Sequence, residues 1–196
     1  LRGRTLKKPV VLTYHCDLQL PPTLFSKLVD KVVFTSNVLA ARWSNAIVAY
    51  TQDYATHSPF LSRYLSKVQV IPPPVHVPTP TVEDMATFRS KWNLNGHRVI
   101  ASVARLATEK GVEYLLGALP KILEAHPTAR ILFGGPYQNV LGEEAYARRV
   151  RPLIERYPDH WTFLGPLNSL EVATLFACSD VAVLPSINST ESFGLV

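Results

Sequence analysis

The second half of the chain alternates regularly between short apolar runs and segments with helical periodicity. The runs at 99–103, 129–133, 161–164 and 180–184 predict strands, and the segments between them predict helices. This alternation predicts a parallel sheet covered by helices on both faces, in which every strand is buried. Ligands of such sheets bind beyond the carboxyl ends of the strands. Functional residues are therefore expected in the loops at those ends.

The first part of the chain repeats the pattern less regularly. Strands are predicted at 10–14, 46–50 and 68–71. Helices are predicted at 24–45, with a break near Thr35, and at 58–65. Pro72-Pro73-Pro74 ends the third predicted strand, and the proline-rich segment from Val75 to Thr81 predicts an extended, semi-rigid linker. Together these features predict two α/β domains, residues 1–77 and residues 78–196.

The composition favours anionic binding partners but does not identify which kind. The net charge of +5 suits anions such as nucleotides, phospholipid headgroups or nucleic acid. The two cysteines, Cys16 and Cys178, are too few and too far apart in the sequence for a disulfide framework or a metal motif. This predicts that the protein resides in a reducing cytoplasm. No apolar run reaches the roughly 18 residues that a membrane span needs.

Two cations flank the loop after the predicted strand 99–103. Arg105 and Lys110 precede a helix that begins near Gly111. An arginine fork and a lysine point charge beside a helix N-terminus would hold a diphosphate. An exposed loop in which Arg105 pairs with Glu109 explains the same residues equally well, and the sequence leaves both interpretations open.

A carboxylate, Glu191, follows the predicted strand 180–184 and precedes a helix that is predicted to begin at Ser192. A carboxylate beside a helix N-terminus can hold hydroxyl groups and a phosphate together. The alternative is a carboxylate that only interacts with the helix dipole.

Two further strand ends carry polar or glycine residues. His15 and Asp17 follow the first predicted strand. His15 could transfer a proton or bind a substrate hydroxyl, and Asp17 could orient it or bind an acceptor hydroxyl. A structural histidine is the alternative. The turn at Gly134 and Gly135 would let a ligand approach the backbone closely.

In this order, the motifs resemble the retaining glycosyltransferases of the GT-B fold, family four, also called glycosyl transferases group 1. The residues that carry the resemblance are His15-x-Asp17, Arg105-Leu106-x-x-x-Lys110-Gly111, Gly134-Gly135-Pro136, Pro185-Ser186 and Glu191-Ser192-Phe193-Gly194-Leu195-Val196. The resemblance implies two Rossmann-like domains with parallel sheets. It also implies that the first domain lacks its beginning and that the second is truncated.

The resemblance also implies roles for single residues. Arg105 and Lys110 would neutralise the donor diphosphate, and Glu191 would hold hydroxyls of the donor sugar. His15 would lie near the transferred sugar, with Asp17 on the acceptor side. The remaining donor-binding positions are Gly134, Gly135, Leu167, Phe193, Gly194, Leu195 and Val196, with Leu167 meeting the nucleobase. The chain departs from the family at Ala104, where glycine is usual, and at Gly134-Gly135-Pro136, which replaces a Gly-x-Gly turn.

The expected function is transfer of a sugar, with retention, from a nucleoside-diphosphate sugar to a hydroxyl of a glycan, glycolipid or polysaccharide acceptor. No metal or other cofactor is expected, because no Asp-x-Asp motif is present and two cations can replace a divalent ion. The protein is expected to be cytoplasmic, and peripheral contact with the inner face of the membrane is left open. Nucleic acid is not expected as a partner. Two rival functions stay open: a sugar-nucleotide epimerase on the same fold, and a non-catalytic protein that binds nucleotides or other anions.

Overall fold

The computed structural model describes residues 2–18 and 24–188. The chain divides into two compact units, unit 1 within Leu1–Val75 and unit 2 from His76 to Asn188. Each unit is described by itself.

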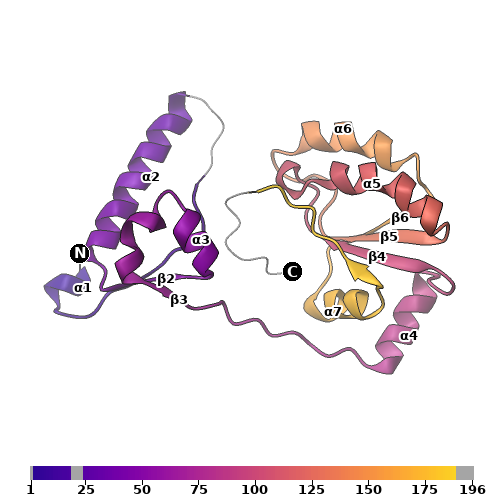
Figure 1. The fold of residues 1–196 in the computed structure, drawn as a ribbon, viewed down its shortest axis with the longest axis horizontal. Coiled ribbons are helices and arrows are strands. Elements are labelled where there is room, and N and C mark those ends of the chain that lie inside the picture. Colours follow the sequence, from indigo (N-terminus) through magenta and orange to yellow (C-terminus); the bar gives the residue numbers. More distant parts are fainter. Residues whose placement is uncertain (1, 19–23, 189–196) are drawn as a thin grey trace. The chain divides into compact units, whose positions relative to one another are not determined.

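Unit 2 is a parallel sheet with helices on both faces (Figure 1). The strand order is β6-β5-β4-β7. The strands are β4 (Arg98–Val103), β5 (Ala129–Gly134), β6 (Trp161–Gly165) and β7 (Val181–Ala182). The helices are α4 (Val82–Lys91), α5 (Val112–Ala125), α6 (Glu144–Ile154) and α7 (Ser169–Ala177), with a 3-10 turn, η2 (Thr108–Lys110), before α5. The predicted α/β fold with a parallel sheet is confirmed.

Alternate side chains of the central strands enter two different cores. Ile131 and Phe133 of β5 pack with residues of α5 and α6. Leu132, between them, packs on the opposite face with Phe88 of α4 and Leu175 of α7. Because successive side chains of a strand point to opposite faces, a strand covered on both sides must be apolar throughout. This is why β4 and β5 stand out in the sequence as unbroken apolar runs.

The last strand differs from its prediction. β7 covers only two residues, at the end of the described sheet beside β4. Val181 and Leu184 are each 49% exposed. The prediction of a buried strand at 180–184 is therefore wrong for the part of the chain that the structure describes, because β7 has a neighbouring strand on one side only.

Two helices of unit 2 begin with reciprocal caps. Thr81 accepts a hydrogen bond from the Asp84 backbone N–H, and the Asp84 carboxylate accepts one from the Thr81 N–H. Asn168 and Glu171 form the same arrangement at the start of α7. Each capping box satisfies N–H groups that have no partner within the helix. These caps fix where α4 and α7 begin.

Unit 1 contains a three-stranded parallel sheet in the order β1-β2-β3. Its elements are α1 (Arg2–Thr5), β1 (Val11–Thr13), α2 (Leu24–Trp43), β2 (Ala46–Ala49), α3 (Gln52–His57), the 3-10 segment η1 (Leu61–Lys67) and β3 (Val68–Val70). The buried core residues are Tyr14, Ala41, Ile47, Ala49, Tyr54, Ala55, Phe60 and Leu61.

Helix α2 runs without the break expected near Thr35. The hydroxyl of Thr35 donates to the carbonyl of Lys31, and that of Ser36 donates to the carbonyl of Val32. Each hydroxyl thus bonds back within the helix instead of competing with it. At the C-terminal end of α2, the Lys67 ammonium donates to three backbone carbonyls at 2.9–3.2 Å, those of Ala41, Arg42 and Ser44.

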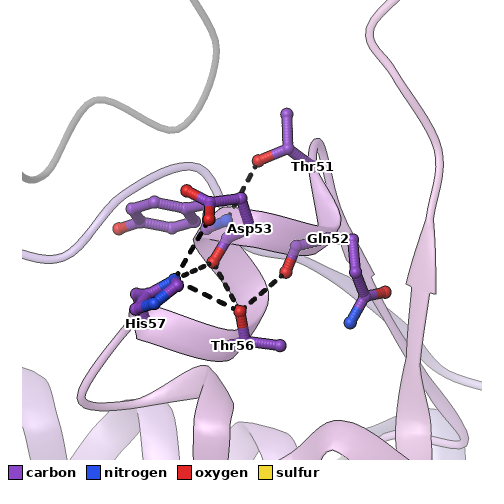
Figure 2. A network of polar contacts seen from close by, with 6 residues as sticks. Thr51, Gln52, Asp53, Thr56 and His57 are labelled. Carbon is purple, nitrogen blue, oxygen red and sulfur yellow. Dashed lines mark hydrogen bonds and ion pairs between the residues drawn. The ribbon is translucent and has the colours of Figure 1, made fainter.

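The short helix α3 was not predicted, and the helix predicted at 58–65 is instead η1. Figure 2 shows the polar contacts that hold α3 together. The Thr51 hydroxyl accepts from the Tyr54 N–H, and Thr56 donates to the carbonyl of Asp53. His57 Nδ1 lies 3.2 Å from a carboxylate oxygen of Asp53. Local polar contacts therefore stabilise this helix. Its sequence has no helical repeat of apolar residues, which is why the helix was not predicted.

Residues 71–81, which include the boundary between the two units, have no regular secondary structure. Within residues 2–18 and 24–188, no helix is both long enough and apolar enough to cross a membrane.

Candidate functional site

Three loops meet at the carboxyl ends of the strands of unit 2. The Ala104 N–H donates to the Gly134 carbonyl at 2.9 Å, and the Leu106 N–H donates to the Pro136 carbonyl at 2.8 Å. The Gly135 N–H donates to the Gly165 carbonyl at 2.7 Å. These backbone bonds hold the loops after β4, β5 and β6 side by side.

The glycine turn after β5 brings three of the predicted donor-binding residues together. Gly135 has φ +119°, and a Cβ there would lie 2.3 Å from the Ala104 carbonyl oxygen. Only glycine fits this position, on grounds of both backbone angle and space. A Cβ on Gly134 would lie 2.7 Å from the Leu167 side chain. Gly134, Gly135 and Leu167 therefore lie close together at the carboxyl ends of the strands.

Arg105 forms an ion pair in the loop after β4. Its Nη2 lies 2.6 Å from Glu109 Oε1, and its Nε donates to the same oxygen at 3.2 Å. The Arg105 side chain is 53% exposed and that of Glu109 is 25% exposed. This is the Arg105–Glu109 pair of the second interpretation, and it leaves the guanidinium partly open to solvent.

The loop after β7 is fixed against the same segment. The Ile187 N–H and the Ser186 hydroxyl both donate to the Glu109 carbonyl, at 3.0 and 3.1 Å. Gly111 has φ +59°, and a Cβ there would lie 2.2 Å from the Pro185 carbonyl oxygen. The Pro185-Ser186 motif therefore lies directly against Glu109 and Gly111.

The first N–H of α5 already has a hydrogen-bond partner. The Val112 N–H donates to the Tyr146 hydroxyl at 3.2 Å, and that hydroxyl donates to the Glu113 carboxylate. Burial, and then the hydrogen bond to Glu113, raises the pKa of Tyr146 above its usual range. The first N–H of α5 is therefore not available to an anion unless this bond breaks.

In unit 1, His15 contacts Tyr50. The Tyr50 hydroxyl and His15 Nδ1 form a hydrogen bond of 2.5 Å, and the two rings meet edge to face. When the phenol donates this bond, a neutral imidazole carries its proton on Nε2. His15 is exposed.

Two tyrosines bind the carboxylate of Asp17. The Tyr14 hydroxyl donates to Oδ1 at 3.0 Å, and the Tyr54 hydroxyl donates to Oδ2 at 2.8 Å. Burial, and then the bond to Asp17, raises the pKa of both phenols above their usual range. Asp17 also lines a cavity of about 360 Å³ between the β1 loop and α2, together with Asp30, Phe34, Asn37 and Phe60 among others.

The remaining predicted site residues lie outside the described residues. They are Glu191, Phe193, Gly194, Leu195 and Val196. Within the described ranges, no group of three or more His, Cys, Asp or Glu side chains lies together as a metal site would require.

Sequence reasoning missed two residues that hold the Arg105–Lys110 loop, Glu143 and Tyr146. Glu143 accepts two hydrogen bonds from Thr108, which lies 35 positions earlier in the chain. Tyr146 contacts Val112 across a similar separation. No local pattern in the sequence pointed to either contact.

Comparison with known proteins identifies the family. The family model described as glycosyl transferases group 1 matches residues 84–196, more than half of the chain. The chain belongs to this family. The resemblance inferred from its motifs is thereby confirmed.

Relatives of this chain in glycosyl transferases group 1 include proteins named as glycosyltransferases. It is 34% identical to the uncharacterized glycosyltransferase MJ1607 of Methanocaldococcus jannaschii over 116 residues, 58% of this chain and 27% of that protein. It is 26% identical to a D-inositol 3-phosphate glycosyltransferase of Corynebacterium efficiens over 201 residues, 94% of this chain and 43% of that protein. The chain thus spans less than half the length of either relative.

Solved structures show the same fold. Anabaena HepE in complex with UDP and glucose superposes with a TM-score of 0.76 at 20% identity, covering 98% of this chain and 50% of HepE. Sucrose-phosphate synthase from Thermosynechococcus elongatus gives a TM-score of 0.71 at 23% identity, covering 98% of this chain and 49% of the synthase. The GT-B fold predicted for the chain is confirmed.

Proposed function

We propose that the protein to which this chain belongs is a retaining glycosyltransferase that uses a nucleoside-diphosphate sugar as donor. The observation that carries the proposal is the Arg105–Lys110 loop, which backbone bonds fix at the carboxyl ends of β4 and β5. Family membership and the UDP and UDP-glucose in the HepE structures support this class of donor. The acceptor is a compound with a free hydroxyl group.

The chemistry follows from where charge develops. The bond between the sugar and the diphosphate breaks, and negative charge builds on the leaving phosphate. Arg105 and Lys110 stabilise that charge, since preorganised cations act on the transition state without reorganising. The acceptor oxygen bonds to the anomeric carbon on the face that the diphosphate leaves, and its proton passes to the leaving phosphate. This same-face route yields retention without a carboxylate nucleophile.

The other predicted residues take supporting roles in the proposal. His15, held by Tyr50, contacts the transferred sugar, and Asp17 binds the acceptor side. Glu191 holds donor-sugar hydroxyls, while Leu167 and the glycine turn meet the nucleotide. We also propose that Arg105 and Lys110 take the place of a divalent cation, so that EDTA leaves transfer by the full-length enzyme unchanged.

The deciding experiment is Lys110→Ala in the full-length enzyme, with Lys121→Ala as control. Lys121 is an exposed lysine further along α5. Lys110→Ala is expected to slow transfer on the order of 100-fold, about 3 kcal/mol, while Lys121→Ala leaves the rate unchanged. Near-normal transfer by Lys110→Ala would contradict the assignment.

The same assay separates the two rival functions. An epimerised donor as the product would identify a sugar-nucleotide epimerase. A protein that turns over no donor and binds anions with strong salt dependence would be a non-catalytic binding protein.

A further inference from the structure

The 3-10 turn that carries Lys110 has no cap of its own. Its N-cap residue is Ala107, whose side chain cannot accept a hydrogen bond. The N–H groups at the start of such a turn have no partner within it. The acceptor comes instead from a distant residue: Glu143 Oε2 accepts the Thr108 N–H at 2.9 Å and the Thr108 hydroxyl at 2.7 Å.

The backbone of Glu143 is fixed on both sides. Its N–H donates to the Val140 carbonyl at 3.0 Å, and its carbonyl accepts the Ala147 N–H at 2.9 Å. It occupies the N-cap position of α6, but its side chain makes no capping bond to that helix. The carboxylate bonds to Thr108 instead, so the start of α6 holds the turn.

The same helix holds the segment at a second point. Tyr146, one turn further along α6 and 4% exposed, accepts the Val112 N–H at 3.2 Å. Thr108 and Val112 lie two residues before and two residues after Lys110. Side chains at the start of α6 therefore form hydrogen bonds to the chain on both sides of Lys110. The segment Pro185-Ser186-Ile187 contacts Glu109 and Gly111.

We propose that Glu143 is a positioning residue for donor binding: its carboxylate holds Thr108, and through it the turn that presents Lys110 and Arg105 to the diphosphate. The proposal rests on the proposed function for the identity of the ligand, but the hold on Thr108 itself does not. Small displacements of charged groups that bind a diphosphate weaken binding strongly, because the ligand is held at fixed points.

The test compares Glu143→Ala, Glu143→Gln and Glu144→Ala in the full-length enzyme. Glutamine keeps an oxygen that can accept both Thr108 bonds. Glu144 is the adjacent, exposed carboxylate and serves as the matched control. The first measurement is amide hydrogen exchange, without ligand, on peptides covering residues 105–111. Exchange is expected to rise in Glu143→Ala and to stay at the wild-type level in the other two variants.

The second measurement is calorimetric titration with uridine diphosphate, guanosine diphosphate and inorganic pyrophosphate, at a temperature where every variant is folded. For the probe that binds wild type best, Glu143→Ala is expected to raise Kd on the order of tenfold. Glu143→Gln is expected to restore it to within about twofold, and Glu144→Ala to leave it unchanged. A purely structural residue would lower the melting temperature without this change in Kd.

The outcomes separate this proposal from the proposed function. Unchanged exchange in Glu143→Ala, or an unchanged Kd while Lys110→Ala binds poorly, would overturn the positioning role alone. A Glu143→Gln variant as impaired as Glu143→Ala would also overturn it, because hydrogen-bond acceptance would not be the cause. Failure of wild type to bind any of the three probes would overturn the proposed function and the ligand named here, while raised exchange would still support the hold on Thr108.

Discussion

Replacement of Gly111 by alanine tests how tightly the loops at the carboxyl edge of unit 2 are packed. Gly111 adopts φ +59°, ψ +33°, between η2 and α5. Alanine in this left-handed region costs about 1–2 kcal/mol. In addition, its Cβ would lie 2.2 Å from the Pro185 carbonyl oxygen, a backbone atom that cannot rotate away. The loop after β7 must therefore move.

The cost of that movement follows from the bonds that it breaks. Displacing Pro185 separates the Ile187 N–H and the Ser186 hydroxyl from the Glu109 carbonyl. Each such hydrogen bond contributes roughly 0.5–1.5 kcal/mol net. Adding two bonds to the backbone strain, we expect Gly111→Ala to destabilise unit 2 by about 2–5 kcal/mol.

Two other glycines of unit 2 separate the contributions. Gly96 has φ +77°, and a Cβ there would have no atom within 4 Å, so Gly96→Ala isolates the backbone strain of about 1–2 kcal/mol. Gly117 lies inside α5 with the same open space, so Gly117→Ala should stabilise by roughly 0.5–1 kcal/mol. The assay is urea unfolding followed by fluorescence in a Trp43→Phe background, where Trp92 and Trp161 report on unit 2. Equal losses for Gly111→Ala and Gly96→Ala would refute the close packing of Pro185.

Three further changes test the polar contacts. Lys67→Met should destabilise unit 1 by about 1–3 kcal/mol, measured by urea unfolding, because three carbonyls at the end of α2 lose a charged donor. Asp180 accepts from the Val99 N–H, and this bond and then Arg98 lower its pKa below the usual 3.8. Its stabilisation is therefore present above about pH 4 and lost as the pH falls, so melting curves of Asp180→Asn should depend less on acid pH. Tyr146 has a raised pKa, so its stabilisation is present below about pH 10 and lost as the pH rises further. Tyr146→Phe should flatten that alkaline loss and lower stability at neutral pH.

The fold of unit 2 could be predicted because its signals are local. Strands buried on both faces must be apolar throughout, and the predicted bounds of β4 and β5 lie within one residue of the observed ones. The same alternation of strands and helices predicted the positions of the loops that follow β4 and β5. Unit 1 was harder: α3 is built from polar contacts within one helical turn or so, which carry no periodicity. The apolar run around β7 predicted a buried strand, because such a run cannot distinguish a strand with two neighbours from one that, within the described residues, has only one.

The candidate site was predicted only as far as single loops. Arg105 and Lys110 could be named from their order and spacing, and the structure places them on a loop bonded to the Gly134-Gly135 turn. The contacts that hold this loop join residues more than 30 positions apart, as in Thr108 with Glu143. Such pairs follow from how α6 packs beside α5, which no local pattern encodes.

The two interpretations of Arg105 that the sequence left open are compatible with each other. A partly exposed ion pair such as Arg105–Glu109 contributes only about 0–1 kcal/mol. In the proposed function, a diphosphate binds Arg105 and Lys110 together and displaces Glu109 at little cost, because it carries more charge than one carboxylate. The Glu109 backbone is itself held by Ser186 and Ile187, which fixes where its side chain begins. The Arg105–Glu109 pair is therefore no argument against the diphosphate site of the proposed function, because a ligand that binds both cations gains more than the pair loses.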